Sequence, residues 1–300
     1  MSGPGDLSAV PVTPTLLRSW PLPALGSGKR ERGTVLVIGG ARRTPGAVLL
    51  AGMAALRAGA GRLTLAVAES AAVPLAVAMP EAGVVGLPES PSGSVRASAM
   101  EVLEPDLEQA DSILLGPGLD NPKETAELLR NLLAREQEIE ERTIVLDAFA
   151  LGVLSGLQHE LRPWAGRLIL TPNPTELRLL LGREPRDFRA DTVEVAQKYR
   201  AVVSCQGVIA EPRKDGEDNG GCWELTTGSG GLGTSGSGDV LSGTIAGLCA
   251  RGTNNVHAAC WGSHLHAAAG DRLASRKGSP GYLARELSDE LPPLMMELGT

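Results

Sequence analysis

The sequence predicts an α/β protein in which helices cover both faces of a mostly parallel sheet. Short apolar runs rich in β-branched residues alternate along the chain with longer runs of good helix formers. Such alternation is typical of repeated β-α-β units, whose strands are parallel and buried on both sides. The chain has 300 residues, 42% hydrophobic and 21% charged, which suits one large globular domain or two small ones.

The first β-α-β unit begins near residue 34. Thr34–Ile38 has the sequence TVLVI and ends at two glycines, so we expect a buried strand there. Thr44-Pro45 resembles a helix start, because proline is tolerated in the first turn, and the helix formers of Ala47–Ala58 follow. Gly59 suits a helix C-terminus, and Leu63–Val67 is the next predicted strand.

The alternation continues to the end of the chain. Further strands are expected at Val84–Leu87, Ile113–Leu115, Ile144–Leu146, Leu168–Leu170, Val202–Glu211 and Cys222–Thr226, the last two joined as a hairpin through Arg213–Gly221. Helices are expected at Val95–Leu103, Lys123–Ala134, Thr175–Leu181, Ala190–Arg200, Val240–Arg251, Val256–Ser275 and Tyr282–Leu298, the last broken at Pro292-Pro293. We expect residues 135–142 to be a solvated helix end, residues 1–32 an irregular arm, and residues 33–300 a single catalytic domain.

Composition argues against several classes of partner. The formal net charge is −7 and aromatic residues make up 3%, so nucleic-acid and anionic-membrane partners are disfavoured. The N-terminus lacks the pattern of a signal peptide, and no apolar run has the length of a membrane span. The four cysteines form no C-x-x-C pair, so we expect free thiols in a cytoplasmic protein.

A glycine-rich turn, Gly228–Asp239, is the strongest candidate site. Six of the eleven residues from Gly228 to Gly238 are glycine, and a helix is expected to follow directly. A helix N-terminus exposes unpaired amide N–H groups at the positive end of its dipole, which forms a natural phosphate cradle. The turn has neither the lysine of a Walker A loop nor the spacing of a dinucleotide fingerprint.

Asp239 stands at the mouth of this turn. Its carboxylate could cap the helix, or it could act as a base beside a bound phosphate. No other acidic residue lies between Glu224 and Asp271, so we expect no second carboxylate to compete for the role of base. Together, cradle and carboxylate indicate an enzyme that acts on a phosphoanhydride.

The turn resembles the signature G-N-P-G-M-A-T-G-G-T-G-D-V-L-x-G of the ADP-dependent NAD(P)H-hydrate dehydratases, a carbohydrate-kinase-like family of the ribokinase-like superfamily. Other stretches resemble further motifs of the family, in the same order, across roughly residues 30–298. They are Gly39–Ala47 with Ala54–Gly61, the G-P-G-L loop Gly116–Leu119, Leu146–Ala148, the T-P-N-P-T-E stretch Thr171–Glu176 and the H-A-A-A-G-D stretch His266–Asp271. Each motif is weak alone, but their common order is a specific signal.

The resemblance implies a three-layer α/β/α ribokinase-like fold and a particular reaction. The substrate would be the S-form of hydrated NADH or NADPH (NADHX or NADPHX). ADP or ATP would phosphorylate its hydroxyl, and phosphate would then leave, restoring NAD(P)H with release of AMP and phosphate when ADP is the donor. Mg²⁺ is expected beside the phosphates. The chain would be a homo-oligomer, by resemblance a tetramer.

Carried over position by position, the resemblance also assigns residues. Asp239 would take the hydroxyl proton, and no residue is assigned to a metal. The residues that would face the hydrate are Ala47, Gly118, Asn173 and Asp239. The residues that would face the adenine nucleotide are Gln206, Gly207, Gly236, Ser237 and Gly238.

Three positions depart from the family pattern. Asn173 replaces a histidine and cannot carry a proton charge, and Phe149 replaces an aspartate. Gln206 replaces the lysine of a K-G-x-x-T stretch that helps to hold the nucleotide. A charge-assisted contact is typically worth about 1.5–3 kcal/mol, so we expect weak nucleotide affinity.

Two alternative functions remain open on the same residues. A small-molecule kinase of the superfamily would phosphorylate a sugar or hydroxymethyl group with the same turn and aspartate. A weakly active nucleotide-binding paralogue would account for the three departures.

Other polar residues have two interpretations each. Asp147 either takes part in the site or caps a turn, and Arg42-Arg43 either meets a phosphate or is solvated. His257, His264 and His266 share one predicted helix. We expect them to be hydrogen-bonded interior or surface residues, because no acidic or cysteine partner suggests a metal site.

Overall fold

The computed structural model describes residues 8–24, 26, 28–135, 139, 142–213, 220–228 and 231–299, and within them ten strands form one sheet. Their order across the sheet is β1-β10-β9-β8-β7-β6-β5-β2-β3-β4. The strands are β1 Val10–Val12, β2 Thr34–Ile38, β3 Arg62–Ala68, β4 Gly83–Leu87, β5 Ser112–Leu115, β6 Thr143–Leu146, β7 Leu168–Leu170, β8 Val202–Cys205, β9 Val208–Ala210 and β10 Cys222–Leu225. Of these, β9 alone runs antiparallel to its neighbours, so the predicted mostly parallel sheet is confirmed.

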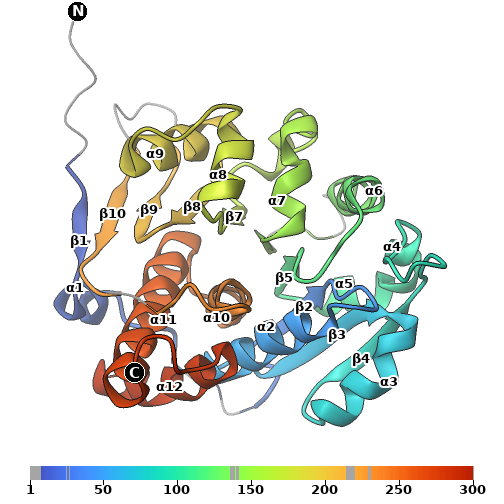
Figure 1. The fold of residues 1–300 in the computed structure, drawn as a ribbon, viewed down its shortest axis with the longest axis horizontal. Helices are drawn as coiled ribbons and strands as arrows, with labels where there is room; N and C mark the ends of the chain where they lie inside the picture. The colour runs from blue at the N-terminus through green and yellow to red at the C-terminus, as the bar shows by residue number, and fades with distance from the viewer. Residues whose placement is uncertain are drawn as a thin grey trace, which may run out of the picture.

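Helices cover both faces of the sheet (Figure 1). They are α1 Pro14–Ser19, α2 Pro45–Arg57, α3 Glu69–Ala78, α4 Ala99–Val102, α5 Glu104–Gln109, α6 Pro122–Leu133, α7 Phe149–Val153, α8 Pro174–Leu181, α9 Phe188–Tyr199, α10 Ser237–Ala250, α11 Asn255–Lys277 and α12 Ala284–Glu297. In the described part of the chain, no helix is both long and apolar enough to cross a bilayer.

The sheet is buried on both sides because alternate residues of a strand point to opposite faces. In β2, Val35 and Val37 join the apolar core beneath α2, α10, α11 and α12. Leu36 and Ile38 join the core beneath α6, α7, α8 and α9. Two cores on either side of one sheet give the expected three layers.

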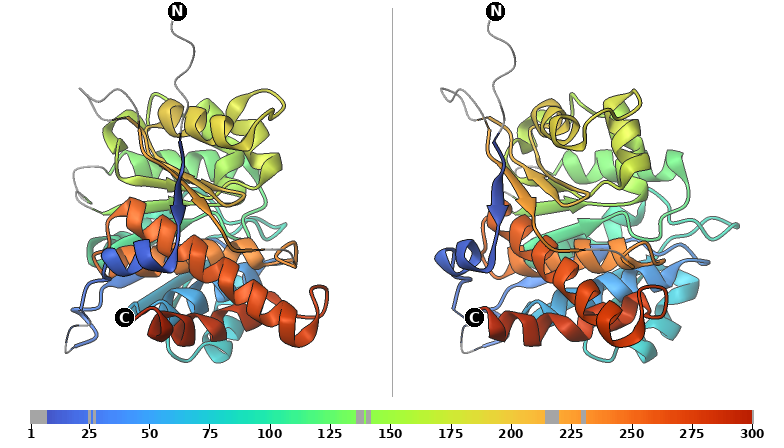
Figure 2. Two further views of the ribbon diagram at one scale, coloured as in Figure 1. Left: turned by 90° about the vertical axis from the view of Figure 1, so that its left-hand side faces the viewer. Right: turned by 60° about the vertical axis from the view of Figure 1, so that its left-hand side comes forward.

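The N-terminal segment differs from the predicted irregular arm. β1 pairs in parallel with β10, with Val10 opposite Trp223, and Figure 2 shows the two strands side by side. The segment is also fastened to α11, because the Trp261 indole N–H donates to the carbonyl of Trp20 at 3.0 Å. These partners lie near the other end of the chain, so local sequence patterns do not reveal them. Residues 1–7, 25 and 27 of the predicted arm lie outside the described residues, and the domain boundary at residue 33 stays a prediction.

Three further elements differ from the expectation. The helix α3 is not expected from the sequence. Val95 pairs with Glu89 in an isolated bridge, so only α4, at Ala99–Val102, is present of the helix expected at Val95–Leu103, and α5 follows it at Glu104–Gln109. α12 continues through Pro292 and Pro293. Its buried apolar residues pack against the core along the whole helix, and this packing compensates for the hydrogen bonds that proline removes.

The run predicted as one strand at Val202–Glu211 is divided into two. β8 and β9 form a tight hairpin whose two-residue turn is Gln206-Gly207. Both residues have positive φ angles, 49° and 82°, as a type I′ turn requires. The predicted antiparallel pairing across Arg213–Gly221 is present between β9 and β10, although residues 214–219 of that connection lie outside the described residues. Most of the charged run 135–142 lies outside them as well.

α2 and α10 pack backbone to backbone. A Cβ atom built on Gly243 would lie 2.1 Å from the carbonyl oxygen of Ala51, and one on Gly247 would lie 2.5 Å from that of Ala55. A step of one turn along either helix therefore corresponds to one turn along the other in the same direction, so the helices are parallel. Their N-termini lie at the same end of the sheet.

We expect Gly243→Ala to destabilise the protein by about 1–3 kcal/mol, because the added methyl group meets backbone that cannot change rotamer. Denaturant unfolding would measure the loss. The matched control is Gly152→Ala in α7, where a Cβ meets nothing within 4 Å. This control should be neutral or stabilising by up to about 1 kcal/mol, and equal effects of the two changes would contradict the packing argument.

Candidate active site

The register of α2 on α10 brings two predicted site residues together. Ala51 meets Gly243, so one turn earlier Ala47 lies opposite Asp239, in the first turn of each helix. Helices that follow parallel strands begin at the carboxyl edge of the sheet, where ligands bind in open α/β folds. The register therefore places Asp239 at that edge.

The N-terminus of α10 has the geometry of an anion cradle. Gly236 is the N-cap residue with a φ of 88°, and a Cβ there would lie 2.4 Å from the Leu50 side chain, so glycine alone fits. The amide N–H groups of Gly238 and Asp239 are in the first turn and have no acceptor within the helix. A Cβ on Gly238 would meet nothing within 4 Å, which shows that this turn borders open space.

His266 of α11 holds the first residue of α10. Its Nε2 atom lies 2.8 Å from the Ser237 hydroxyl and 3.0 Å from the Ser237 carbonyl oxygen. Burial lowers the pKa of His266 to about 4, so the ring is neutral at physiological pH. The expectation of a hydrogen-bonded interior histidine is confirmed for this residue.

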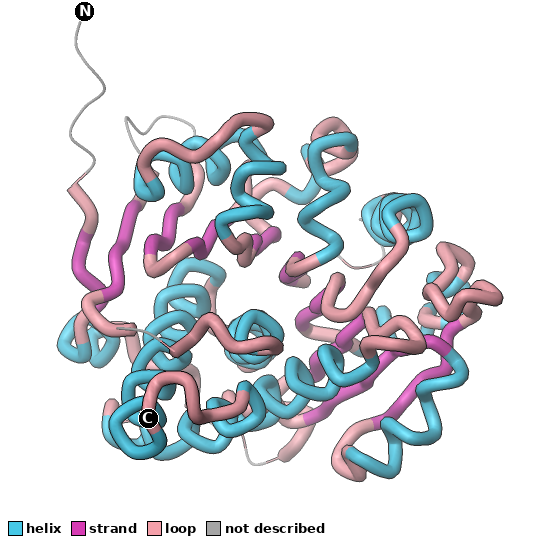
Figure 3. The backbone as a smooth tube through the Cα atoms, in the orientation of Figure 1, coloured by secondary structure: helices cyan, strands magenta, loops and turns pink. Residues whose placement is uncertain are grey.

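The same stretch of α11 supports the glycine-rich loop, which passes over α11 before it enters α10 (Figure 3). The Gly228 N–H donates to the Asp271 carboxylate at 2.8 Å. A Cβ on Gly270 would lie 2.7 Å from the Leu232 side chain, so this glycine provides the space that the loop occupies. The motif at 266–271 thus serves as a platform for the loop, and Ser229 and Gly230 lie outside the described residues.

Gly118 lies against the start of α2. Its carbonyl oxygen accepts from the Thr44 hydroxyl at 2.7 Å and from the Ala41 N–H at 2.8 Å. Its φ is 71°, and a Cβ would lie 2.3 Å from the Thr44 carbonyl oxygen and 3.2 Å from the Ala47 side chain. Gly118, Ala47 and Asp239 therefore form one side of the site.

A cavity of about 580 Å³ forms the other side. Its walls include the Gln206-Gly207 turn, Asn173, Ser237 and Gly238, whereas Gly236 does not line it. Thr227, which sequence reasoning missed, also lines this cavity, and its buried hydroxyl has no hydrogen-bond partner in the described structure. The cavity is of the size that small-molecule ligands occupy.

Two further carboxylates accompany Asp239, contrary to the expectation that none would. Burial raises the pKa of Asp239 to about 7, with a further contribution from the charge of Asp147. Burial likewise raises the pKa of Glu176 to about 7, and the charges of Asp147 and Asp239 act in the same direction. The sequence does not reveal this group, because Asp147, Glu176 and Asp239 lie far apart along the chain and follow different strands of the sheet.

Asp147 is the fixed member of the group. One carboxylate oxygen accepts from the Thr171 hydroxyl and the other from the Ser242 hydroxyl, both at 2.8 Å. Burial raises the pKa of Asp147 to about 6, although these hydrogen bonds oppose the effect. Since Ser242 lies one turn beyond Asp239, Asp147 ties α10 to the ends of β6 and β7. These hydrogen bonds join Asp147 to two elements of the site, which the interpretation of Asp147 as a turn cap does not include.

The chain matches the family model described as NAD(P)H-hydrate dehydratase over residues 35–293. The chain belongs to the NAD(P)H-hydrate dehydratase family. It is 43% identical over 292 residues to an ADP-dependent (S)-NAD(P)H-hydrate dehydratase of Xanthomonas campestris pv. campestris, and the alignment covers 96% of each chain.

Two solved structures have the same fold as this chain. An ADP/ATP-dependent NAD(P)H-hydrate dehydratase of Bacillus subtilis, co-crystallised with ATP and Mg²⁺, has a TM-score of 0.76 at 26% identity and covers 98% of this chain and 100% of its own. A ribokinase-like superfamily protein of Enterococcus faecalis has a TM-score of 0.80 at 23% identity, with 99% of both chains covered. The predicted ribokinase-like fold is confirmed.

Two other predicted candidates, Arg42 and His257, have contacts with residues outside the dehydratase-family site. Arg42 is held by an ion pair with Glu89 and by the Pro91 carbonyl, which accounts for it structurally. His257 stacks on Trp20 with ring centroids 4.2 Å apart. Among the described residues, no group of three His, Cys, Asp or Glu side chains forms a metal-ligand set.

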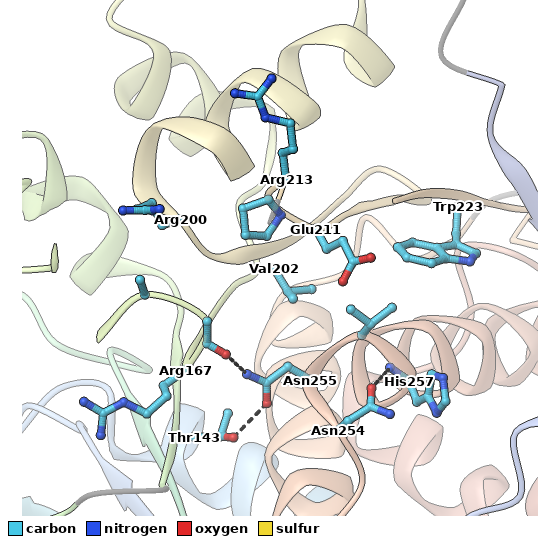
Figure 4. A pocket seen from close by; sticks show the side chains of 14 residues that line it. Thr143, Arg167, Arg200, Val202, Glu211, Arg213, Trp223, Asn254, Asn255 and His257 are labelled. Atoms are coloured by element: carbon cyan, nitrogen blue, oxygen red, sulfur yellow. Dashed lines mark hydrogen bonds between the residues drawn. The ribbon is translucent and has the colours of Figure 1, made fainter. Parts of the chain in front are cut away.

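A larger cavity, of about 840 Å³, lies at the opposite edge of the sheet, where β6 and β8 begin (Figure 4). Asn255 lines this cavity. Its side chain accepts a hydrogen bond from the Thr143 hydroxyl and donates one to the Gly166 carbonyl, each at 2.7 Å. Figure 4 shows the guanidinium groups of Arg167, Arg200 and Arg213 well apart from one another, so they do not converge on one ligand position. The dehydratase motifs gather around the smaller cavity.

The pKa of Asp239 predicts a pH-dependent effect of Asp239→Asn on stability. Between the ordinary aspartate value and about 7, the native state holds a proton that the unfolded chain has lost, so stability falls as pH rises through this window and stays lower above it. Asparagine removes this cost. We expect Asp239→Asn to raise the melting temperature by roughly 2–4 °C at about pH 8, and by less at about pH 5.

Thermal unfolding of both proteins at the two pH values measures this difference. An equal shift at both pH values would show that the ionised carboxylate does not cause it.

Proposed function

We propose that this chain catalyses the ADP- or ATP-dependent dehydration of the S-form of hydrated NADH or NADPH, restoring NAD(P)H. The observation that carries the proposal is the position of Asp239. Its carboxyl group lies in the first turn of α10, beside the amide cradle and opposite Ala47, and burial raises its pKa to about 7. A base whose pKa lies near the working pH is suited to take a hydroxyl proton and to release it again.

In the first step, Asp239 accepts the proton of the substrate hydroxyl as the hydroxyl oxygen attacks the terminal phosphorus of the nucleotide. The N–H groups at the start of α10 stabilise charge on the transferring phosphoryl group. With ADP as donor, AMP leaves. In the second step, phosphate leaves the ring carbon and the ring double bond returns.

We assign the two sides of the site to the two substrates. The hydrate occupies the side formed by Ala47, Gly118 and Asp239, together with Asn173 from the adjoining cavity wall. The adenine nucleotide occupies the cavity, with Gln206, Gly207, Ser237 and Gly238 in its walls and Gly236 as the N-cap of α10 beside them. Thr227 lines this cavity, and its buried hydroxyl has no partner within the described residues.

The carboxylate oxygens of Asp239 and Glu176 fit Mg²⁺, which prefers hard oxygen ligands, but no protein group of three such ligands is present among the described residues. The ion would therefore arrive with the nucleotide phosphates and keep several waters. When bound, it would neutralise negative charge on the phosphates. A homotetramer and a cytoplasmic location also remain predictions, taken from the resemblance and from the sequence respectively.

We expect purified protein with Mg²⁺ and ADP or ATP to convert the S-hydrate to NADH or NADPH, measured by the absorbance of the restored dihydronicotinamide. Asp239→Asn should abolish this turnover. A stable phosphorylated product from a sugar or hydroxymethyl substrate would instead support a kinase. Nucleotide binding without any turnover, for any substrate, would support an inactive paralogue.

Gln206 is a specific reason to expect weak nucleotide binding, since it places an uncharged amide where the family pattern has lysine. We expect Gln206→Lys to tighten ADP binding at least about tenfold, because a charge-assisted contact is gained. Titration calorimetry measures the change. Gln206→Met, of similar length and without charge, is the matched control and should bring no gain. Unchanged affinity in the lysine variant would remove Gln206 from the nucleotide site.

A further inference from the structure

The turn between β2 and α2 borders the side of the site that we assign to the hydrate. It runs from Ala41 to Thr44, and the Thr44 N–H donates to the Ala41 carbonyl at 2.9 Å. The Ala41 N–H and the Thr44 hydroxyl also donate to the carbonyl of Gly118, at 2.8 Å and 2.7 Å. Because Gly118 belongs to the hydrate side, these hydrogen bonds fix both ends of the turn beside that substrate.

The two central residues of this turn are arginines with different surroundings. The Arg42 guanidinium is held by an ion pair with Glu89, and it donates to the Pro91 carbonyl at 3.1 Å and to the Ser70 hydroxyl at 3.2 Å. Arg43 is exposed, and no hydrogen bond or ion pair joins its guanidinium to another residue that the structure describes. Arg42 therefore anchors the turn, whereas Arg43 presents a cation to solvent.

The place of Arg43 relative to α2 matches one part of the hydrate. Ala47, the third residue of α2, lies opposite Asp239, whereas Arg43 comes two residues before Pro45, where the helix begins. Asp239 marks the position of the nicotinamide ring, because it takes the proton of the ring hydroxyl. A Cβ on Gly46 would meet nothing within 4 Å, so the first turn of α2 borders open space. A dinucleotide that leaves the ring along this turn brings its pyrophosphate, one ribose away, to Arg43.

The charges around the site favour an arginine at this position. The carboxyl groups of Asp147, Glu176 and Asp239 act on one another at the ring end of the site, and the chain has a formal net charge of −7. A negatively charged pyrophosphate therefore needs a local cation. The positive end of the α2 dipole lies beside Arg43 and acts in the same direction. A guanidinium can also donate two parallel hydrogen bonds to phosphate oxygens.

We propose that Arg43 binds the pyrophosphate of the hydrate and so contributes to the affinity of the enzyme for this substrate. The proposal rests on the proposed function and adds to it a residue that recognises the substrate away from the reacting ring. In the described structure, no residue of the Ala41–Thr44 turn lines the cavity that we assign to the adenine nucleotide. Arg43 should therefore affect binding of the hydrate and leave binding of ADP unchanged.

Arg43→Met tests this role because it removes the charge and keeps an unbranched side chain. We expect the KM for the hydrate to rise about tenfold, as for the loss of one charge-assisted contact. The kcat and the KM for ADP should stay close to the parent values, since the contact is the same before and during the reaction. NADH hydrate and NADPH hydrate should be affected alike, because both contain the pyrophosphate. Arg43→Lys, which keeps the charge but not the paired donors, should recover part of the loss.

Arg30→Met is the matched control. Arg30 is an exposed arginine in the turn before β2, whereas Arg43 follows the end of that strand, so the two lie at opposite edges of the sheet. The same loss of charge at Arg30 should leave the KM for the hydrate at the parent value. Equal melting temperatures of the variants and the parent would establish that folding is intact.

Each outcome bears on the proposal. An unchanged KM for the hydrate in Arg43→Met overturns it, and so does an equal rise in Arg30→Met, which would show a general effect of charge. A rise for NADPH hydrate alone would place Arg43 at the 2′-phosphate, and a rise for ADP alone would place it at the nucleotide. Either result overturns the assignment to the pyrophosphate.

Failure of the proposed function gives a different result. In that case the unmodified protein restores no NAD(P)H from the hydrate. Titration calorimetry with NADH, which has the same pyrophosphate, then tests Arg43 without turnover. About tenfold weaker binding in Arg43→Met would support the contact, and equal affinity of this variant and the parent would overturn it.

Discussion

Direct contact between the backbones of α2 and α10 is the constraint on which the rest of the site depends. Because Gly243 and Gly247 place no side chain between the helices, main-chain atoms of fixed geometry set their separation. The contact aligns two helix N-termini at one edge of the sheet and directs both dipoles at the same region. It also fixes Asp239 relative to Ala47, where an error of about 1 Å can cost a hundredfold in rate.

The electrostatics of the site balance these positive helix ends against three carboxylates. Three full negative charges would repel a phosphate-bearing ligand. Burial, however, raises the pKa values of Asp147, Glu176 and Asp239 to about 6–7, and charge repulsion adds to the effect at Glu176 and Asp239. At neutral pH the group therefore carries fewer than its three formal charges. Carboxyl groups that exchange protons near neutrality are suited to proton transfer, and their partial neutralisation also lets an anionic ligand approach.

The sequence was sufficient for the parallel sheet and for the glycine-rich turn, because both have local patterns. It was also sufficient to place Asp147 and Thr171 directly after two strands whose ends lie at the same edge of the sheet. Their common position was a signal from which the carboxylate group could have been predicted. It was not sufficient for the hairpin turn at Gln206, where an apolar run continues on either side of two turn residues. The roles of His266 and Asp271 depend on how α11 crosses the glycine-rich loop, a tertiary arrangement that periodicity does not encode.

The pairing of β1 with β10 has a consequence for synthesis of the chain. Val10 emerges from the ribosome long before Trp223, its partner across the sheet. At the usual rates of translation the first strand waits roughly 10–40 s for its neighbour. Pro11 lies at its centre and has no N–H to donate, and the strand is three residues long. Both properties make it a poor template for pairing with another nascent chain during this interval.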